Sequence, residues 1–287
     1  MSSLTYDQLI ERFVKWAETQ PDIRAAVIIG SRARVDHPAD DWSDLDIVVV
    51  TTDPEHYLSK ADWLENIGSY WLTFIEPTAA GNEKERRVLF KDSLGVDFAI
   101  IHREKVQKVI QDGQVAGVFR RGMRVLLDKD GITSQLTPSS AEPPSPHPPS
   151  HSEFLEVVND FWYHAVWTAK KLRRGELWTA KACSDSYMKW RLIRMMEWHA
   201  RSMKGWGYDT WHSGRFLEEW ADPRPLEGLR SAFAYYNKDD VWRGLLATME
   251  LFRWVAVETA DRLKYQYPTV ADEGATELVK TYLWGDL

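Results

Sequence analysis

The first 130 residues show two patterns of apolar positions. One segment near the start has helical spacing, and the segments after it are short apolar runs. Thr5 and Gln8 form a capping-box pattern, and apolar residues recur at helical spacing from there to Pro21. The runs that follow are short and rich in β-branched or aromatic residues, which predicts strands over 25–29, 45–51, 70–75, 87–90 and 96–101. The last two runs suit a hairpin around residues 91–95, and a short helix is expected over 104–111.

A proline-rich segment then divides the chain. Between Gly131 and Ser152 there are six prolines and few apolar residues, which is typical of an extended connector. After it, strand patterns nearly vanish and helical spacing returns over 154–169, 187–201, 215–220 and 241–263. We therefore expect an α+β domain over residues 1–132, a connector over 133–152 and an all-α helical bundle domain over 153–287.

Three acidic residues stand in or beside the predicted strands. Asp44 and Asp46 open the run at 47–50 and point to the same side, because residues i and i+2 of a strand share a face. Asp97 lies inside the run at 96–101, and three carboxylates converge if these strands are neighbours. Carboxylates so close raise one another's pKa, and a divalent cation relieves the repulsion. Oxygen ligands favour Mg²⁺ over zinc.

Gly30 and Ser31 directly follow the strand expected at 25–29. Such a turn presents backbone N–H groups and a hydroxyl to phosphate oxygens. A metal site beside a phosphate-binding turn indicates nucleotide chemistry. Arg32 comes next and suits either a triphosphate contact or a solvated loop charge. Asp97, set between apolar neighbours, is costly to bury unpaired, so it needs a metal, a role as a base or a basic partner.

The pattern of Gly-Ser, a spacer, Asp-x-Asp and a later third Asp resembles nucleotidyltransferases of the polymerase-beta type. Gly30-Ser31-Arg32-Ala33 and residues 42–47 further resemble the aminoglycoside 6-adenylyltransferase (streptomycin adenylyltransferase) family. Weaker similarity continues through residues 125–131 into the helical half, so it spans nearly the whole chain. The departures at Arg34-Val35 and Trp211-His212 affect the acceptor and triphosphate contacts rather than the reaction type.

The resemblance implies a mixed-sheet nucleotidyltransferase domain followed by a substrate-binding helical domain. Its activity would be Mg²⁺-dependent transfer of AMP from ATP to a hydroxyl of an aminoglycoside such as streptomycin, with release of pyrophosphate. Asp44 and Asp46 would hold the metal, and Asp97 would act as general base or share a metal ion. Nucleotide contacts would come from Gly30, Ser31 and Arg32, and in the helical domain from Lys170 and Lys189.

Two further acids suit the ammonium groups of an acceptor, although each also fits a solvated charge. Glu76 lies near the expected mouth of the sheet, and Asp160 lies on the polar side of its predicted helix. Other readings remain open: the same chemistry on a lincosamide, a protein or a tRNA, as in antitoxin-like enzymes, or a non-catalytic nucleotide-binding regulator. The complete set of three acids disfavours the regulator.

The composition of the chain limits the classes of partner and the location that we expect. The 287 residues carry a net charge of −7, which disfavours nucleic acid as a partner and suits a small cationic molecule. Cys183 is the one cysteine, so no intrachain disulfide forms. The first residues lack a signal-peptide pattern, and no apolar run approaches the roughly 20 residues of a membrane helix. We expect a cytoplasmic protein that does not bind membranes.

Overall fold

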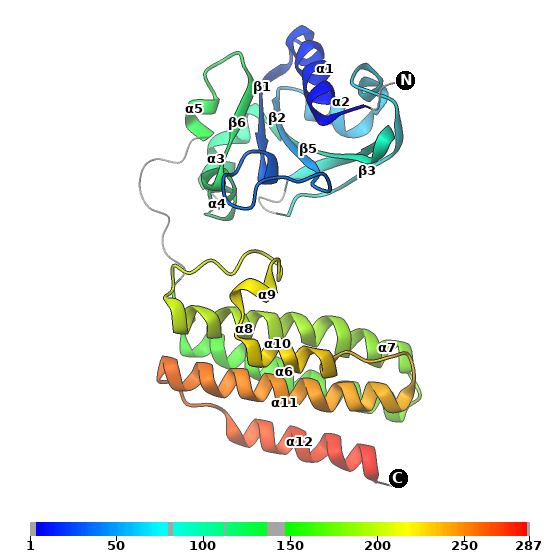
Figure 1. Cartoon of the computed structure of the whole chain (residues 1–287), viewed down its shortest axis with the longest axis vertical. Helices are drawn as coiled ribbons and strands as arrows, with labels where there is room; N and C mark the ends of the chain where they lie inside the picture. The colour runs from blue at the N-terminus through cyan, green and yellow to red at the C-terminus, as the bar shows by residue number, and fades with distance from the viewer. Residues whose placement is uncertain (1–3, 80–82, 112, 137–146, 286–287) are drawn as a thin grey trace. The chain divides into compact units, whose positions relative to one another are not determined.

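The computed structural model describes residues 4–79, 83–111, 113–136 and 147–285. The chain forms two compact units, residues 1–143 and 144–287, and each is described by itself. The first unit combines a mixed sheet with helices and the second is helical, which confirms the expected fold class (Figure 1). None of the helices in these ranges is both long and apolar enough to cross a membrane.

The sheet of the first unit has six strands in the order β3-β4-β5-β2-β1-β6. β2 and β5 are parallel, and the other neighbouring pairs are antiparallel. The five expected strands are confirmed. The sixth, β6, pairs with β1 at the sheet edge and was not predicted, because its apolar run is only three residues long. The bounds are β1 Ile23–Ile29, β2 Leu45–Thr51, β3 Tyr70–Pro77, β4 Lys84–Phe90, β5 Leu94–His102 and β6 Arg124–Asp128.

Helices cover the two faces of the sheet unequally. On one face, Leu9, Phe13 and Ala17 of α1 pack into a core with side chains such as Ile47 and Phe98. On the other face, Phe119 of α4 joins a smaller core at one end of the strands. The capping box at Thr5 is confirmed. The helices are α1 Tyr6–Thr19, α2 Pro54–Ser59, α3 Val106–Gln111, α4 Gly113–Arg121 and α5 Thr133–Leu136.

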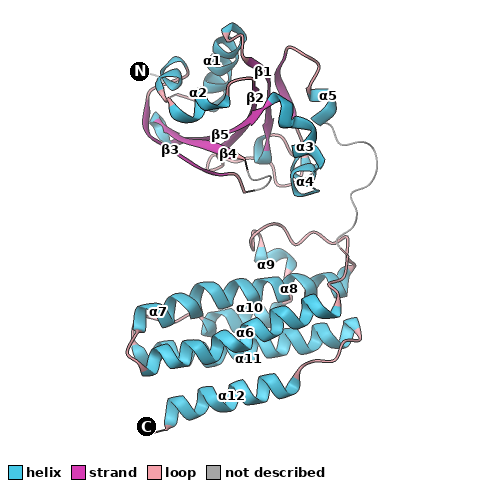
Figure 2. Ribbon diagram, turned by 180° about the vertical axis from the view of Figure 1, so that it is seen from behind, coloured by secondary structure: helices cyan, strands magenta, loops and turns pink. Residues whose placement is uncertain are grey.

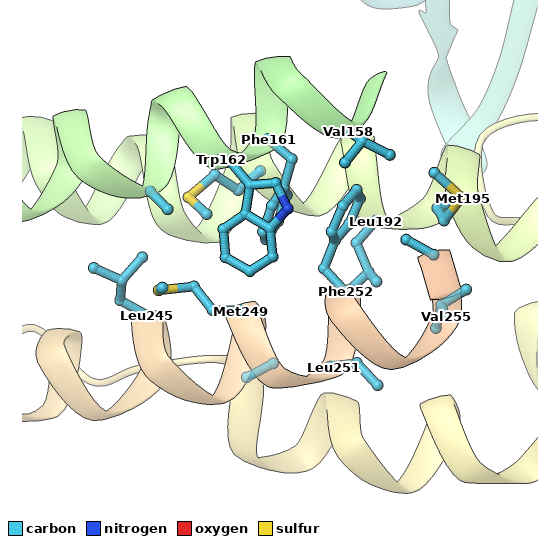
Figure 3. Close-up of a cluster of buried hydrophobic side chains, with 14 of the residues drawn as sticks. Val158, Phe161, Trp162, Leu192, Met195, Leu245, Met249, Leu251, Phe252 and Val255 are labelled. Carbon is cyan, nitrogen blue, oxygen red and sulfur yellow. The ribbon is translucent and has the colours of Figure 1, made fainter. Parts of the chain in front are cut away.

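The second unit is a bundle of helices (Figure 2). Its core is built mainly from α6, α8 and α11, where the rings of Phe161 and Phe252 stack with centroids 3.6 Å apart (Figure 3). The chain has fifteen tryptophans, and four of them fill this core: Trp162, Trp198, Trp220 and Trp242. Five others are exposed: Trp42, Trp71, Trp178, Trp190 and Trp284. The helices are α6 His151–Arg173, α7 Leu177–Ala182, α8 Met188–Lys204, α9 Leu217–Trp220, α10 Pro223–Ala232, α11 Lys238–Leu263 and α12 Thr269–Trp284.

Both ends of the expected connector at 133–152 are helical. Residues 133–136 form α5, and α6 begins at His151 behind a capping box of Ser150 and Glu153. The connector was expected to run to residue 152, but α6 already begins at His151. The capping box explains this earlier start, because it satisfies the first N–H groups of α6. Residues 137–146, with four of the six prolines, lie outside the described residues.

A buried ion pair fixes α12 to the bundle. Asp272 is buried, and its Oδ2 accepts hydrogen bonds from Arg253 Nε at 2.7 Å and from the Tyr267 hydroxyl at 2.8 Å. Thr276 Oγ1 donates to Asp272 Oδ1 at 3.1 Å, and Trp162 Nε1 donates to the Tyr267 hydroxyl at 3.1 Å. Through these contacts α12 is joined to both α11 and α6.

We predict that Arg253→Met lowers the free energy of unfolding by about 2 kcal/mol, because it leaves the buried Asp272 carboxylate without its cation. Urea unfolding followed by circular dichroism measures this. The control is Arg230→Met, which breaks an exposed pair with Glu227 and should cost less than about 1 kcal/mol. Equal losses in the two variants would contradict the role given to the buried pair.

Candidate active site

Strand register brings the three predicted carboxylates together. Asp46 of β2 lies opposite Asp97 of the parallel strand β5, and Asp44 precedes β2 by one residue. One ligand oxygen from each of the three side chains lies within 4.8 Å of the others. The convergence expected from the strand pattern is therefore confirmed, and the oxygens form a cluster that suits a hard divalent cation. Their metal-binding and catalytic roles stay predictions.

The turn after β1 is built against this cluster. Gly30 has φ +70°, and a Cβ at this position would lie 2.1 Å from Asp46 Oδ2, so a side chain here would push the carboxylate aside. The 3₁₀ turn Gly30–Arg32 follows. The hydroxyl oxygen of Ser31 is buried there, and among the described residues it has no hydrogen-bond partner. A buried hydroxyl without a partner is costly, and a bound phosphate oxygen would satisfy it.

Arg32 holds the loop that carries the first acid. Its Nε donates to the carbonyl oxygen of Asp44 at 3.0 Å, and its Nη2 donates to that of Ser43 at 2.7 Å. The guanidinium also lies 3.6 Å from the centre of the Tyr6 ring, and the Tyr6 hydroxyl accepts from the backbone N–H of Gly95 at 3.2 Å. The structure thus gives Arg32 a positioning role for Asp44. Its contact with a nucleotide stays a prediction.

The ionisation of Asp97 is displaced toward neutral pH. Burial raises the pKa of Asp97 to about 6, Arg87 acts to lower it, and the nearby charge of Glu85 acts to raise it. The Asp97 side chain is only 12% exposed, in keeping with desolvation as the main cause. A carboxylate with such a pKa is ionised at pH 7 and is more basic than an ordinary aspartate, which suits proton transfer.

Arg87 of β4 gives Asp97 a basic partner, which is one of the three alternatives that the sequence left open. Its Nη2 lies 3.4 Å from Asp97 Oδ2, and its Nε lies 2.6 Å from Glu76 Oε1 and 3.1 Å from Glu85 Oε1. Glu76 therefore lies on the same sheet face as the cluster and is paired with Arg87. Its contact with an acceptor stays a prediction. Sequence reasoning missed Arg87, because it stands next to Arg86 and the sequence does not tell which of the two faces the acids.

The remaining predicted residues belong to the helical unit. Lys170 is exposed on α6 and lines a groove of about 350 Å³ between α6 and α12. Lys189 is buried, donates to Ser184 O at 3.0 Å and Thr248 Oγ1 at 2.8 Å, and has its pKa lowered to about 8 by burial. The burial and hydrogen bonds of Lys189 are enough to explain it as a structural residue. The nucleotide roles of both Lys170 and Lys189 stay predictions.

Asp160 is held by three neighbours within the helical unit. It forms an ion pair with Arg191, lies 2.7 Å from His164 Nδ1 and accepts from the Tyr187 hydroxyl at 3.0 Å. Its charge is therefore already compensated inside the bundle. A contact between Asp160 and a cationic acceptor stays a prediction.

Comparison with known proteins settles the family. The family model for streptomycin adenylyltransferase matches residues 4–282. The chain belongs to the streptomycin adenylyltransferase family. This confirms the resemblance drawn from the motif residues, and it confirms an enzyme of the nucleotidyltransferase class.

Curated relatives match over nearly their full length. The aminoglycoside 6-adenylyltransferase of Bacillus subtilis (strain 168) is 27% identical over 279 residues, which cover 94% of this chain and 95% of the relative. That of Campylobacter jejuni is 25% identical over 268 residues, covering 89% and 88%. A crystal structure of an aminoglycoside 6-adenyltransferase from Bacillus subtilis aligns over 98% of this chain and 100% of its own, with 23% identity and a TM-score of 0.48.

We predict that Gly30→Ala weakens Mn²⁺ binding by at least about tenfold, because the new Cβ would displace the Asp46 carboxylate. Mn²⁺ titration followed by electron paramagnetic resonance measures the affinity. Gly131→Ala is the matched control: Gly131 also has a positive φ of +68°, but apart from its chain neighbours no described residue has an atom within 4 Å of the added Cβ. If the two variants bind Mn²⁺ equally well, the contact between Gly30 and Asp46 does not shape the site.

The raised pKa of Asp97 gives a pH-dependent prediction for the metal-free protein. The folded state binds the Asp97 proton more tightly than the unfolded state, so this group's contribution to stability is present below about pH 4 and is lost as the pH rises through about 6. Asp97→Asn should therefore raise the free energy of unfolding by about 1–3 kcal/mol at pH 7.5 and change it little at pH 4. Denaturant unfolding in the presence of a chelator measures both values. Destabilisation at pH 7.5 would contradict the assignment.

Proposed function

We propose that this protein transfers the adenylyl group of ATP to a hydroxyl group of an aminoglycoside such as streptomycin, with release of pyrophosphate. The observation that carries the proposal is the cluster of Asp44, Asp46 and Asp97 beside the Gly30-Ser31 turn. Family membership supports the reaction, and the relatives named aminoglycoside 6-adenylyltransferases support the acceptor class.

The residues present fit Mg²⁺. Three carboxylate oxygens within 4.8 Å of one another form a hard anionic ligand set, which on its own is strained by repulsion. The Ser31 hydroxyl, which has no hydrogen-bond partner in the part of the chain that the structure describes, offers a neighbouring contact for the substrate's phosphate. Asp44 and Asp46 would hold the ion, with Asp97 beside them. When bound, the ion would neutralise charge on the phosphates and on the carboxylates.

Each residue of the site has a task in the transfer. The Gly30-Ser31 turn binds and orients the triphosphate through backbone N–H groups and the Ser31 hydroxyl. Asp97 accepts the proton of the acceptor hydroxyl, for which its pKa of about 6 suits it. The acceptor oxygen then forms a bond to the α-phosphorus as the bond to pyrophosphate breaks. Orientation and charge compensation supply most of the rate enhancement in such a reaction.

The two halves of the chain divide the work in this proposal. Residues 1–132 bind ATP and carry the chemistry, and residues 153–287 bind the acceptor and add one contact to the triphosphate. Lys170 contacts the triphosphate, and Glu76 and Asp160 supply negative charge for a cationic drug, in keeping with the net charge of −7. We place the reaction in the cytoplasm, where ATP is available.

We predict that the protein, incubated with Mg²⁺, ATP and streptomycin, adds the mass of one adenylyl group to the drug. Asp97→Asn should lower the rate on the order of 10²–10⁴-fold, because the proton acceptor is lost, while ATP still binds. Mass spectrometry of the drug and a nucleotide-binding titration measure the two effects. The control Asp7→Asn changes an exposed acid of α1 and should keep the wild-type rate.

The same assay separates this proposal from the other acceptors. A panel of aminoglycosides, a lincosamide, tRNA and protein is offered in parallel, each with the four nucleoside triphosphates. Transfer to a lincosamide, tRNA or protein in place of every aminoglycoside would contradict the acceptor class and keep the chemistry. Transfer to no acceptor, with ATP still bound, would favour a nucleotide-binding regulator.

A further inference from the structure

Arg87 lies in line with two of the three carboxylates of the cluster. In the pairing of β4 with β5, Arg87 lies opposite Asp97, and in the pairing of β5 with β2, Asp97 lies opposite Asp46. The three side chains therefore form one row across neighbouring strands on the same face of the sheet. Asp97 has the carboxylates of the cluster on one side and the guanidinium of Arg87 on the other.

Two glutamates fix the position of Arg87. Its Nε lies 2.6 Å from Glu76 Oε1 on β3 and 3.1 Å from Glu85 Oε1 on β4, which leaves Nη2 to reach Asp97 Oδ2 at 3.4 Å. The Arg87 side chain is 42% exposed, and a side chain with that freedom would otherwise sample many rotamers. A planar guanidinium contacts several carboxylates at once, which an ammonium group cannot do in the same way.

We propose that Arg87 is a positioning residue for the transfer reaction. It holds Oδ2 of Asp97, so that the other carboxylate oxygen is directed to the cluster and the acceptor, and it offsets part of the negative charge on this sheet face. Glu76 and Glu85 act through Arg87, by holding its guanidinium in place. This inference rests on the proposed function in one respect: the chemical step that Arg87 supports is adenylyl transfer.

The test compares Arg87→Ala and Arg87→Lys with wild type. The matched control is Arg103→Ala, which removes a half-exposed guanidinium 3.2 Å from Asp130; that carboxylate keeps Arg24 as a partner. Turnover and KM for ATP and acceptor are measured, and Mn²⁺ affinity is measured without any acceptor. Circular dichroism confirms folding, and Arg87→Gln replaces the alanine variant if that variant does not fold.

In Arg87→Ala we expect kcat to fall about 10–100-fold while KM for ATP stays within about twofold, as for other residues that orient a reacting group. Arg87→Lys should recover part of the loss, because it restores the charge. Mn²⁺ should bind the alanine variant about 3–10-fold more tightly, since a cation near the cluster is gone. The Arg103→Ala control should change none of these quantities.

The opposing results are equally definite. Wild-type kcat in Arg87→Ala, or a change confined to the KM of the acceptor, would overturn the positioning role. Unchanged Mn²⁺ affinity in Arg87→Ala would overturn the electrostatic part. If wild type adenylylates no aminoglycoside, the proposed function fails, and the Mn²⁺ measurement still decides the electrostatic role of Arg87, because it needs neither ATP nor acceptor.

Discussion

The mutual repulsion of three carboxylates is the constraint on which the first unit of this protein depends. Parallel pairing of β2 with β5 holds Asp46 opposite Asp97, and the chain entering β2 adds Asp44, so their oxygens lie within 4.8 Å of one another. Such a cluster opposes folding when no cation is bound. The apolar residues that follow the acids along their own strands, such as Ile47 to Val50 of β2, are buried and keep the acids in register.

Three residues next to the carboxylate cluster accommodate its negative charge and its close packing. Gly30 lets the chain turn directly against Asp46, where a side chain would clash. Arg32 holds the loop that leads into Asp44, and Arg87 borders Asp97 from the far side. Arg32 thus acts on the backbone that carries Asp44, and Arg87 contacts the carboxylate of Asp97 directly. Asp46 and Asp97 lie on strands, and Asp44 lies at the end of a loop that Arg32 ties down, so backbone structure positions all three acids.

The sequence predicted five strands and the helical second half from local periodicity, and the i, i+2 rule placed Asp44 and Asp46 on one face. The convergence of Asp97 with them was predicted only for neighbouring strands, and the pairing of β2 with β5 meets that condition. The sequence did not predict β6, whose apolar run is too short to stand out, or Arg87, whose face depends on strand register. The burial of Lys189, whose Nζ donates to Thr248 Oγ1, was not predicted either, and its role as a nucleotide contact stays a prediction. Long-range strand pairing decides β6 and the face of Arg87, and a single sequence carries no direct record of that pairing.

The most direct test is a crystal structure of the protein grown with Mn²⁺ and a non-hydrolysable ATP analogue. We predict an anomalous peak about 2.0–2.3 Å from carboxylate oxygens of Asp44 and Asp46, with the phosphates of the analogue against the Gly30-Ser31 turn. Mn²⁺ bound elsewhere, or phosphates held away from that turn while the three acids stay free of metal, would contradict the account.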